Sequence, residues 1–148
     1  MTTAPVVSSQ IGCWVETFDF VPGAFKVDGT HHDKDVYIIR ISSNGAQYPG
    51  KHIKDTGSYA TWDGKEQNVS KFEMLCHSQL KWVSCYGQEI PPNAFVGGTD
   101  EKGEIWYIGK CYHDGHVVVG MVKKDVGTLY YGWNGKEYKT VMYDILVV

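Results

Sequence analysis

The amino-acid sequence predicts an all-β protein built from short antiparallel strands. The 148 residues include 17 Val, 9 Ile and 20 aromatic residues, but only 4 Leu and 5 Ala. Branched and aromatic side chains favour strands, whereas Leu and Ala favour helices. Seventeen Gly and five Pro supply turns, and no long amphipathic helix is visible. These observations argue against a helical bundle, a coiled coil, a disordered chain and an α/β nucleotide-binding fold.

The two halves of the chain carry the same residue pattern, so the fold is expected to be duplicated. Gly29-Thr30 matches Gly98-Thr99, and Gly50 matches Gly120. The longest match pairs Trp62-Asp63-Gly64-Lys65-Glu66 with Trp133-Asn134-Gly135-Lys136-Glu137. A meander of this length is marginally stable alone. We therefore predict one domain over 1–148, with repeat 1 at about 14–76 and repeat 2 at about 82–148, sharing one β-sandwich-like core with pseudo-twofold symmetry.

Repeat 1 is predicted to be a meander that begins with a strand at 36–41. Asn44-Gly45 follows, a pair of residues that favours a tight hairpin turn. A return strand through Ile53 leads to a second turn at Asp63-Gly64, and an apolar strand at 72–76 closes the repeat.

Repeat 2 is predicted to have the same elements in the same order. Its strands are expected at 105–112, 117–122 and 142–148, with turns at Asp114-Gly115 and Asn134-Gly135. The segment 88–93, which contains Pro91 and Pro92, is the expected connection between the repeats.

Charge and composition exclude several classes of function. The formal net charge is −3, and Arg40 is the only arginine among 14 basic residues, whereas nucleic-acid binders are usually rich in basic residues and use Arg. Residues 1–10 lack the basic and apolar regions of a signal peptide, so we expect a cytoplasmic protein, or one released or displayed by another route. The scattered cysteines at 13, 76, 85 and 111 are expected to be free thiols.

Catalytic and metal-binding motifs are weak. Residues 45–52 approach a phosphate-binding loop, but His52 stands where Ser or Thr would bind magnesium. His31-His32-Asp33 and His113-Asp114-Gly115-His116 could hold a metal only if the fold brought them together; surface positions are the simpler interpretation. No nucleophile motif is present, so we expect neither an enzyme nor a metal or other cofactor. Glu66 and its counterpart are expected to fix turns, and Trp62 and Trp133 to pack against them.

Each half resembles the DM9 repeat. The resemblance is carried in repeat 2 by Trp82, by Ile90 to Phe95, by Gly97-Gly98-Thr99-Asp100, by Glu104 to Lys110 and by Gly135-Lys136-Glu137. In repeat 1 it is carried by Pro22 to Phe25, Tyr37 to Arg40, Pro49-Gly50-Lys51 and Gly64-Lys65-Glu66. It implies two intertwined repeats and, by similarity to tandem DM9 lectins, a dimer that binds mannose without a metal and acts in pathogen recognition, agglutination or host interaction.

The resemblance also implies the residues that contact the sugar: the Asp of Gly-Gly-x-Asp and the Lys of Pro-Gly-Lys. Here each repeat keeps one of the two. Repeat 1 has Lys51 but places His31 at the Asp position, and repeat 2 has Asp100 but places Met121 at the Lys position.

Three replacements are open for the missing groups. Asp28 or Asp33 could supply the carboxylate of repeat 1, with His31 as a further hydrogen-bonding group. Lys123 or Lys110 could supply the ammonium of repeat 2, or Lys51 and Asp100 could form one composite site. We expect a lectin for mannose or mannose-rich glycans; the alternative is a non-catalytic protein-interaction or pore-forming-associated module.

Overall fold

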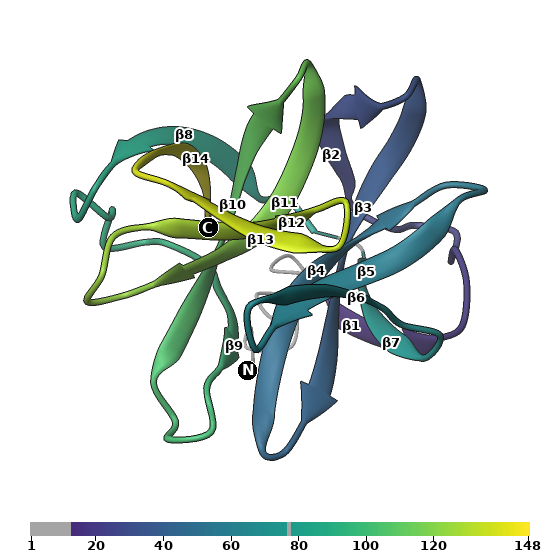
Figure 1. The fold of residues 1–148 in the computed structure, drawn as a ribbon, viewed down its shortest axis with the longest axis horizontal. Helices are drawn as coiled ribbons and strands as arrows, with labels where there is room; N and C mark the ends of the chain where they lie inside the picture. Colours follow the sequence, from purple (N-terminus) through teal and green to yellow (C-terminus); the bar gives the residue numbers. More distant parts are fainter. Residues whose placement is uncertain (1–12, 77) are drawn as a thin grey trace, which may run out of the picture.

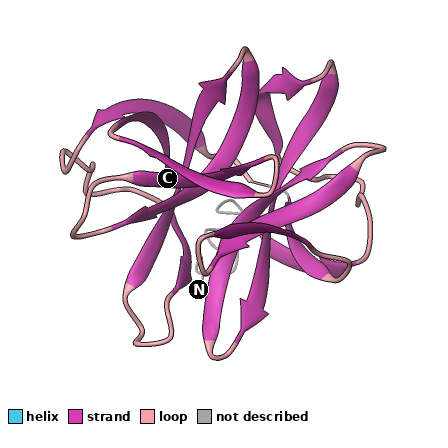
Figure 2. Cartoon of the chain, in the orientation of Figure 1, coloured by secondary structure: helices cyan, strands magenta, loops and turns pink. Residues whose placement is uncertain are grey.

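The strands form one continuous hydrogen-bonded sheet that curls on itself. The computed structural model describes residues 13–76 and 78–148, and within these ranges it contains strands, turns and loops but no helix (Figure 2). The described residues therefore include no helix that could cross a membrane. The all-β prediction is confirmed. A single antiparallel sheet of 14 strands curls so that strands of the two repeats pack against each other.

Repeat 1 supplies the first seven strands. They are β1 (Cys13–Thr17), β2 (Lys26–His31), β3 (Lys34–Ser43), β4 (Ala46–Ile53), β5 (Gly57–Trp62), β6 (Lys65–Asn68) and β7 (Phe72–Cys76). The predicted turns at Asn44-Gly45 and Asp63-Gly64 connect β3 to β4 and β5 to β6, and all four residues have positive φ angles, as a tight hairpin turn of this kind requires.

Repeat 2 supplies the other seven strands. They are β8 (Lys81–Tyr86), β9 (Val96–Thr99), β10 (Ile105–His113), β11 (His116–Lys123), β12 (Leu129–Trp133), β13 (Lys136–Thr140) and β14 (Met142–Val147). The predicted connection at 88–93 proves to lie inside repeat 2, where it joins β8 to β9. The repeats are joined earlier, between β7 and β8, because the strand that carries Trp82 pairs with β14.

The strand order is symmetric about the middle of the sheet. Twelve strands run in the order β1-β7-β3-β4-β5-β6-β13-β12-β11-β10-β14-β8, while β2 pairs with β3 and β9 with β10 off this path. Each strand of repeat 1 thus has its counterpart at the mirrored position. β6 and β13 meet at the centre, where Lys65 pairs with Lys136 (Figure 1). The registers also match, because Lys51 lies opposite Ile38 in repeat 1, and Met121 lies opposite Ile108 in repeat 2.

Curling brings β4 against β9 and β11, and β11 against β2. The two repeats are thereby intertwined, and the largest apolar cluster contains side chains of both. Among its fully buried members, Val27, Val36 and Ile38 come from repeat 1, and Ile108, Val117 and Leu146 come from repeat 2. Two smaller clusters lie within single repeats.

Candidate functional site

Lys51 is the most buried charged residue of the predicted site. It lies on β4 directly after Pro49-Gly50, and only 3% of the residue is exposed. Its ammonium group donates a hydrogen bond to the carbonyl oxygen of Gly132 on β12 at 2.9 Å. The same ammonium forms an ion pair with Glu66 Oε2 on β6, also at 2.9 Å. Strands of both repeats therefore hold one buried positive charge.

Glu66 completes this arrangement from the Gly-Lys-Glu turn. Its second carboxylate oxygen, Oε1, accepts a hydrogen bond from the backbone N–H of Gly135 at 3.2 Å. Gly135 belongs to the equivalent turn of repeat 2, so Glu66 does fix a turn, but that of the other repeat. Its pairing with Lys51 was not foreseen from the sequence, since the two residues lie on separate strands.

His31 closes the pocket from the end of β2. Burial, together with the nearby charge of Lys51 and the rings of His32 and His116, lowers the pKa of His31 to about 4. The imidazole is therefore neutral at physiological pH, with one donor and one acceptor nitrogen. Its Nδ1 atom is buried and has no hydrogen-bond partner among the described residues.

These side chains line a pocket of about 240 Å³ at the junction of the two repeats. The structure thus brings together His31 and Lys51, the two residues at the family's sugar-contacting positions in repeat 1. The complete lining is His31, Lys51, Ile53, Thr56, Tyr59, Glu66, Trp133, Asn134 and Gly135.

Histidine rings surround Trp133 beside the pocket. The backbone N–H of His32 donates to Nδ1 of His116 at 3.0 Å, and the two rings lie 4.1 Å apart. His31 and His113 also pack against Trp133, at 5.3 and 4.5 Å. The fold therefore does bring the two histidine motifs together, although within 13–76 and 78–148 no group of three side chains has metal-binding geometry.

Repeat 2 forms a different site at the equivalent place. Met121 is buried where repeat 1 has Lys51. Asp100 instead pairs with Lys123, whose ammonium lies 3.5 Å from Asp100 Oδ2 and 2.9 Å from Glu104 Oε2. Of the two proposed replacements, Lys123 is thus the lysine that reaches Asp100.

The carboxylate of Asp100 also shapes its own loop. Oδ1 accepts hydrogen bonds from the backbone N–H groups of Lys102 and Glu104, both at 2.9 Å. Partial burial would raise the pKa of Asp100, but these backbone bonds and the charge of Lys123 outweigh it and lower the pKa. Asp100 is accordingly ionised at neutral pH and is already well supplied with donors.

Glu137 is the counterpart of Glu66 but has no equivalent of the Lys51 ammonium group, because Met121 stands at that position. Glu137 is exposed, and its pKa is raised by partial desolvation against the opposing charge of Lys139. Repeat 1 therefore keeps a matched buried ion pair at this place, whereas repeat 2 does not.

The remaining predicted residues lie elsewhere. The exposed side chains of Asp28 and Asp33 do not line the pocket of Lys51, and the carboxylate that pairs with Lys51 belongs to Glu66. Lys110 donates to the backbone carbonyl oxygen of Asp28 at 3.1 Å. The structure does not bring Lys51 and Asp100 into one composite site, because each has its own ion-pair partner in a separate place.

A Ser–His–Asp arrangement also occurs. His52 Nδ1 lies 2.6 Å from the hydroxyl of Ser58 on the neighbouring strand, and His52 Nε2 lies 3.7 Å from Asp19. Both Ser58 and His52 are buried, and burial lowers the pKa of His52. Because both side chains are buried between paired strands, we interpret the pair as a cross-strand hydrogen bond.

Comparison with known proteins agrees with the duplicated pattern. The DM9 repeat family matches residues 30–140. Natterin-1 from Thalassophryne nattereri is 30% identical over 148 aligned residues, which cover 91% of this chain and 37% of Natterin-1.

A solved structure shares the fold. The nematode sperm cell motility protein MFP2B superposes with a TM-score of 0.68 at 12% identity, over 93% of this chain and 44% of that one. The chain thus spans less than half the length of either relative. With a family match over most of its length and a strand pattern repeated twice, the chain belongs to the DM9 repeat family.

Proposed function

We propose that the protein is a lectin that recognises mannose or mannose-rich glycans without a metal, through the pocket of His31, Lys51 and Glu66. The observation that carries the proposal is the buried Lys51–Glu66 ion pair, which borders an accessible pocket. Its volume of about 240 Å³ lies below the roughly 300–1,000 Å³ of pockets for drug-sized ligands, and so suits a single sugar ring.

The donors and acceptors suit sugar hydroxyls. The ammonium group of Lys51 has three N–H donors, of which Gly132 and Glu66 occupy two. The remaining donor can serve a hydroxyl oxygen, while Glu66 and the neutral imidazole of His31 can accept a hydrogen bond from a hydroxyl group. Charge-assisted bonds of this kind are stronger than neutral ones, and none of them requires calcium.

Asp100 and Lys123 form the second candidate contact in repeat 2. Their ion pair could bind sugar hydroxyls in the same way, although Glu104 already pairs with Lys123 and backbone N–H groups already donate to Asp100. Two sites in one chain, doubled in a homodimer, would give the avidity that agglutination needs. The proposal makes the protein a recognition module without enzymatic activity, and its partners the glycans themselves.

Chromatography on immobilised mannose tests the function. We expect the protein to be retained with and without a chelator and to be eluted by free mannose. Failure of the wild-type protein to bind any glycan surface would refute the lectin proposal.

Variants then test the site. Lys51→Met, which installs the residue of repeat 2, and His31→Ala should each weaken retention by at least about tenfold, equivalent to about 1.4 kcal/mol. His31→Asp, which restores the family's carboxylate, should retain or strengthen retention on mannose, and Asp100→Ala should weaken retention less.

The control is Lys65→Ala, a change of an exposed residue on the same hairpin. Because Lys51 is buried, thermal melting must show that each variant is folded. Folded Lys51→Met and His31→Ala variants that bind like wild type would exclude this pocket.

A further inference from the structure

A second pair of equivalent cavities lies where strands of the sheet separate. β10 pairs with β14 only at Gly109–Ile145 and Lys110–Asp144, and a cavity of about 380 Å³ lies beside these pairs. β3 pairs with β7 only at two equivalent positions, and a cavity of about 350 Å³ lies there. We call them the repeat 2 notch and the repeat 1 notch. Since the repeats share one strand register, each position of one notch has its counterpart in the other.

The charged side chains of the repeat 1 notch pair with one another. Arg40 Nε lies 2.8 Å from Glu73 Oε1, and Arg40 Nη2 lies 3.4 Å from Oε2. The guanidinium also covers the ring of Trp14 at 4.3 Å. At the rim, Lys71 pairs with Glu16 at 3.7 Å. These charges satisfy one another and leave little for a ligand.

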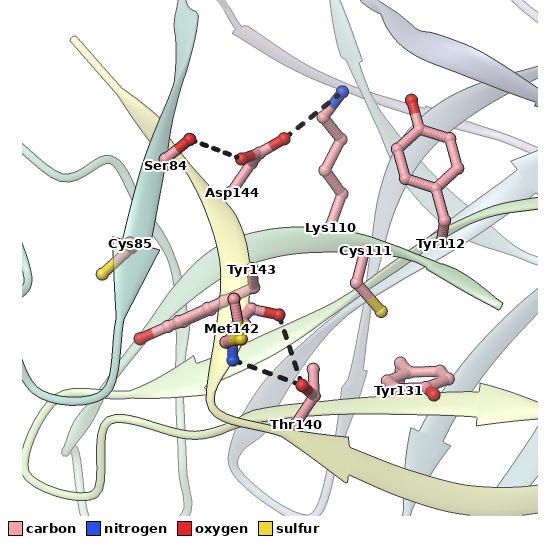
Figure 3. Close-up of a pocket in the computed structure, with 10 residues that line it drawn as sticks. All are labelled: Ser84, Cys85, Lys110, Cys111, Tyr112, Tyr131, Thr140, Met142, Tyr143 and Asp144. Carbon is pink, nitrogen blue, oxygen red and sulfur yellow. Dashed lines mark hydrogen bonds and ion pairs between the residues drawn. The ribbon is translucent and has the colours of Figure 1, made fainter.

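The repeat 2 notch holds a buried ammonium group. Lys110, the counterpart of Arg40, is only 4% exposed. Among the described residues it donates one hydrogen bond, at 3.1 Å to the carbonyl oxygen of Asp28, and lies 4.0 Å from Asp144 Oδ2. It also lies 5.0 Å from the ring centroid of Trp82 and 5.8 Å from that of Tyr112. An ammonium group carries three donors, and a buried charge is stable when its donors are occupied. Asp144 meanwhile accepts one long bond, at 3.4 Å, from Ser84. Figure 3 shows Asp144 between Ser84 and Lys110.

The rim of the repeat 2 notch carries large apolar side chains that the fold does not require. Tyr112 is 56% exposed and Met142 is 67% exposed. The strand registers place Ser42 and Lys71 at these positions in repeat 1. Because repeat 1 builds the same notch with small or charged residues, the exposed ring and thioether of repeat 2 indicate a surface for contact.

The rest of the repeat 2 notch is uncharged. Burial raises the pKa of Cys111 to about 11, so its thiol is neutral. Tyr131, Tyr143 and Thr140 form the adjoining wall (Figure 3). The charges of Lys110 and Asp144 cancel. The carboxylate would repel an anionic ligand, and the ammonium group would repel a cation.

We propose that the repeat 2 notch is a second saccharide-binding site, which takes a neutral hexopyranose unit. One sugar hydroxyl accepts a hydrogen bond from Lys110 Nζ, and a hydroxyl donates to Asp144 Oδ2. Both needs are met by a neutral polyol, but not by a carboxylate, which has no donor, or by an ammonium group, which has no acceptor. The ring of Tyr112, beside Lys110 in Figure 3, supplies an apolar face. The site shares no residue with the pocket of Lys51, and repeat 1 has no working counterpart.

Methionine methyl resonances offer a direct test. In protein labelled with ¹³C-methyl methionine, Met142 is the exposed probe at the notch, while Met74 and Met121 are buried. Met142→Lys, the repeat 1 residue, assigns the signal. The methyl α-glycosides of mannose, glucose and galactose are titrated one at a time, and glycerol serves as the non-specific polyol.

The expected result is a saturable shift of the Met142 signal with at least one glycoside and not with glycerol. Lys110→Arg and Tyr112→Ser, both taken from repeat 1, should weaken that binding by at least about tenfold, while His31→Ala should leave it unchanged. No shift with any glycoside, equal binding by Lys110→Arg, or loss of the shift in His31→Ala would each overturn the proposal. If the repeat 2 notch binds a glycoside while Lys51→Met leaves retention on mannose unchanged, the notch is supported and the pocket of Lys51 proposed above is not.

Discussion

A single lysine side chain connects three strands of both repeats. Lys51 lies on β4, and its ammonium group donates a hydrogen bond to the carbonyl oxygen of Gly132 on β12 and forms an ion pair with Glu66 on β6. Removing one partner of a buried ion pair typically costs about 3–5 kcal/mol. Loss of binding in a Lys51 variant is therefore meaningful only when stability is measured in the same sample.

The histidine of the same pocket makes stability depend on pH. The pKa of His31 falls from 6.5 to about 4 on folding, through burial and the charge of Lys51 and then the rings of His32 and His116. The unfolded chain thus binds a proton at a higher pH than the folded one. Stability from this group is complete above about pH 6.5 and is lost as the pH falls towards 4.

We expect the urea midpoint of the wild-type protein to fall across that window, and to fall less in His31→Gln, which cannot be protonated. The difference between the two curves isolates His31 from other titrating groups. Parallel curves would show that His31 titrates equally in the folded and unfolded states.

The hairpins explain why much of the fold was predictable. Asn-Gly and Asp-Gly turns, branched strands and the internal repeat are local signals, and they correctly located β3, β4, β7, β10, β11 and β14. The hydrogen bond from Lys51 to Gly132 was not predictable, because it depends on curling that brings β12 of repeat 2 to β4. The prediction for 88–93 was wrong because Pro91 and Pro92 indicate a loop but not which strands the loop joins; β8, which precedes it, pairs with β14 of repeat 2.

Glycines inside strands mark where neighbouring elements approach too closely for a side chain. A Cβ atom at Gly50 of β4 would collide with the carbonyl oxygen of Tyr59 on β5, and Gly120 of β11 meets Tyr130 in the same way. Backbone cannot move aside as a flexible side chain can. The two glycines therefore let the strands next to Lys51 and Met121 lie tightly together.

Gly50→Ala should lower the free energy of unfolding by about 3 kcal/mol, since overpacking against backbone lies at the costly end of its range. Gly45→Ala is the control: its Cβ meets nothing, but φ is +81°, so the cost should be only about 1 kcal/mol. Urea unfolding of both variants checks the order; equal losses would contradict the packing argument.

The two repeats form their largest apolar cluster jointly. Residues 13–80 alone would expose Val27, Val36 and Ile38, which pack against Ile108 and Leu146 of the other repeat. A half that cannot bury its core is expected to be unfolded or loosely packed.

We therefore predict that fragments 13–80 and 81–148 each give poorly dispersed NMR spectra, and that mixing them restores the dispersed spectrum of the full chain. A single fragment with dispersed signals and a cooperative melt would show that one repeat is an independent domain, contrary to the prediction of one domain.

The mirrored strand order has a consequence for synthesis. The partners β1 and β7 both lie in repeat 1, but β6 finds β13 only when the chain is nearly complete. Until then the ammonium group of Lys51 lacks the carbonyl oxygen of Gly132, and Glu66 lacks the N–H of Gly135. The pocket is therefore assembled last, so a truncated translation product would carry the lysine but not the site.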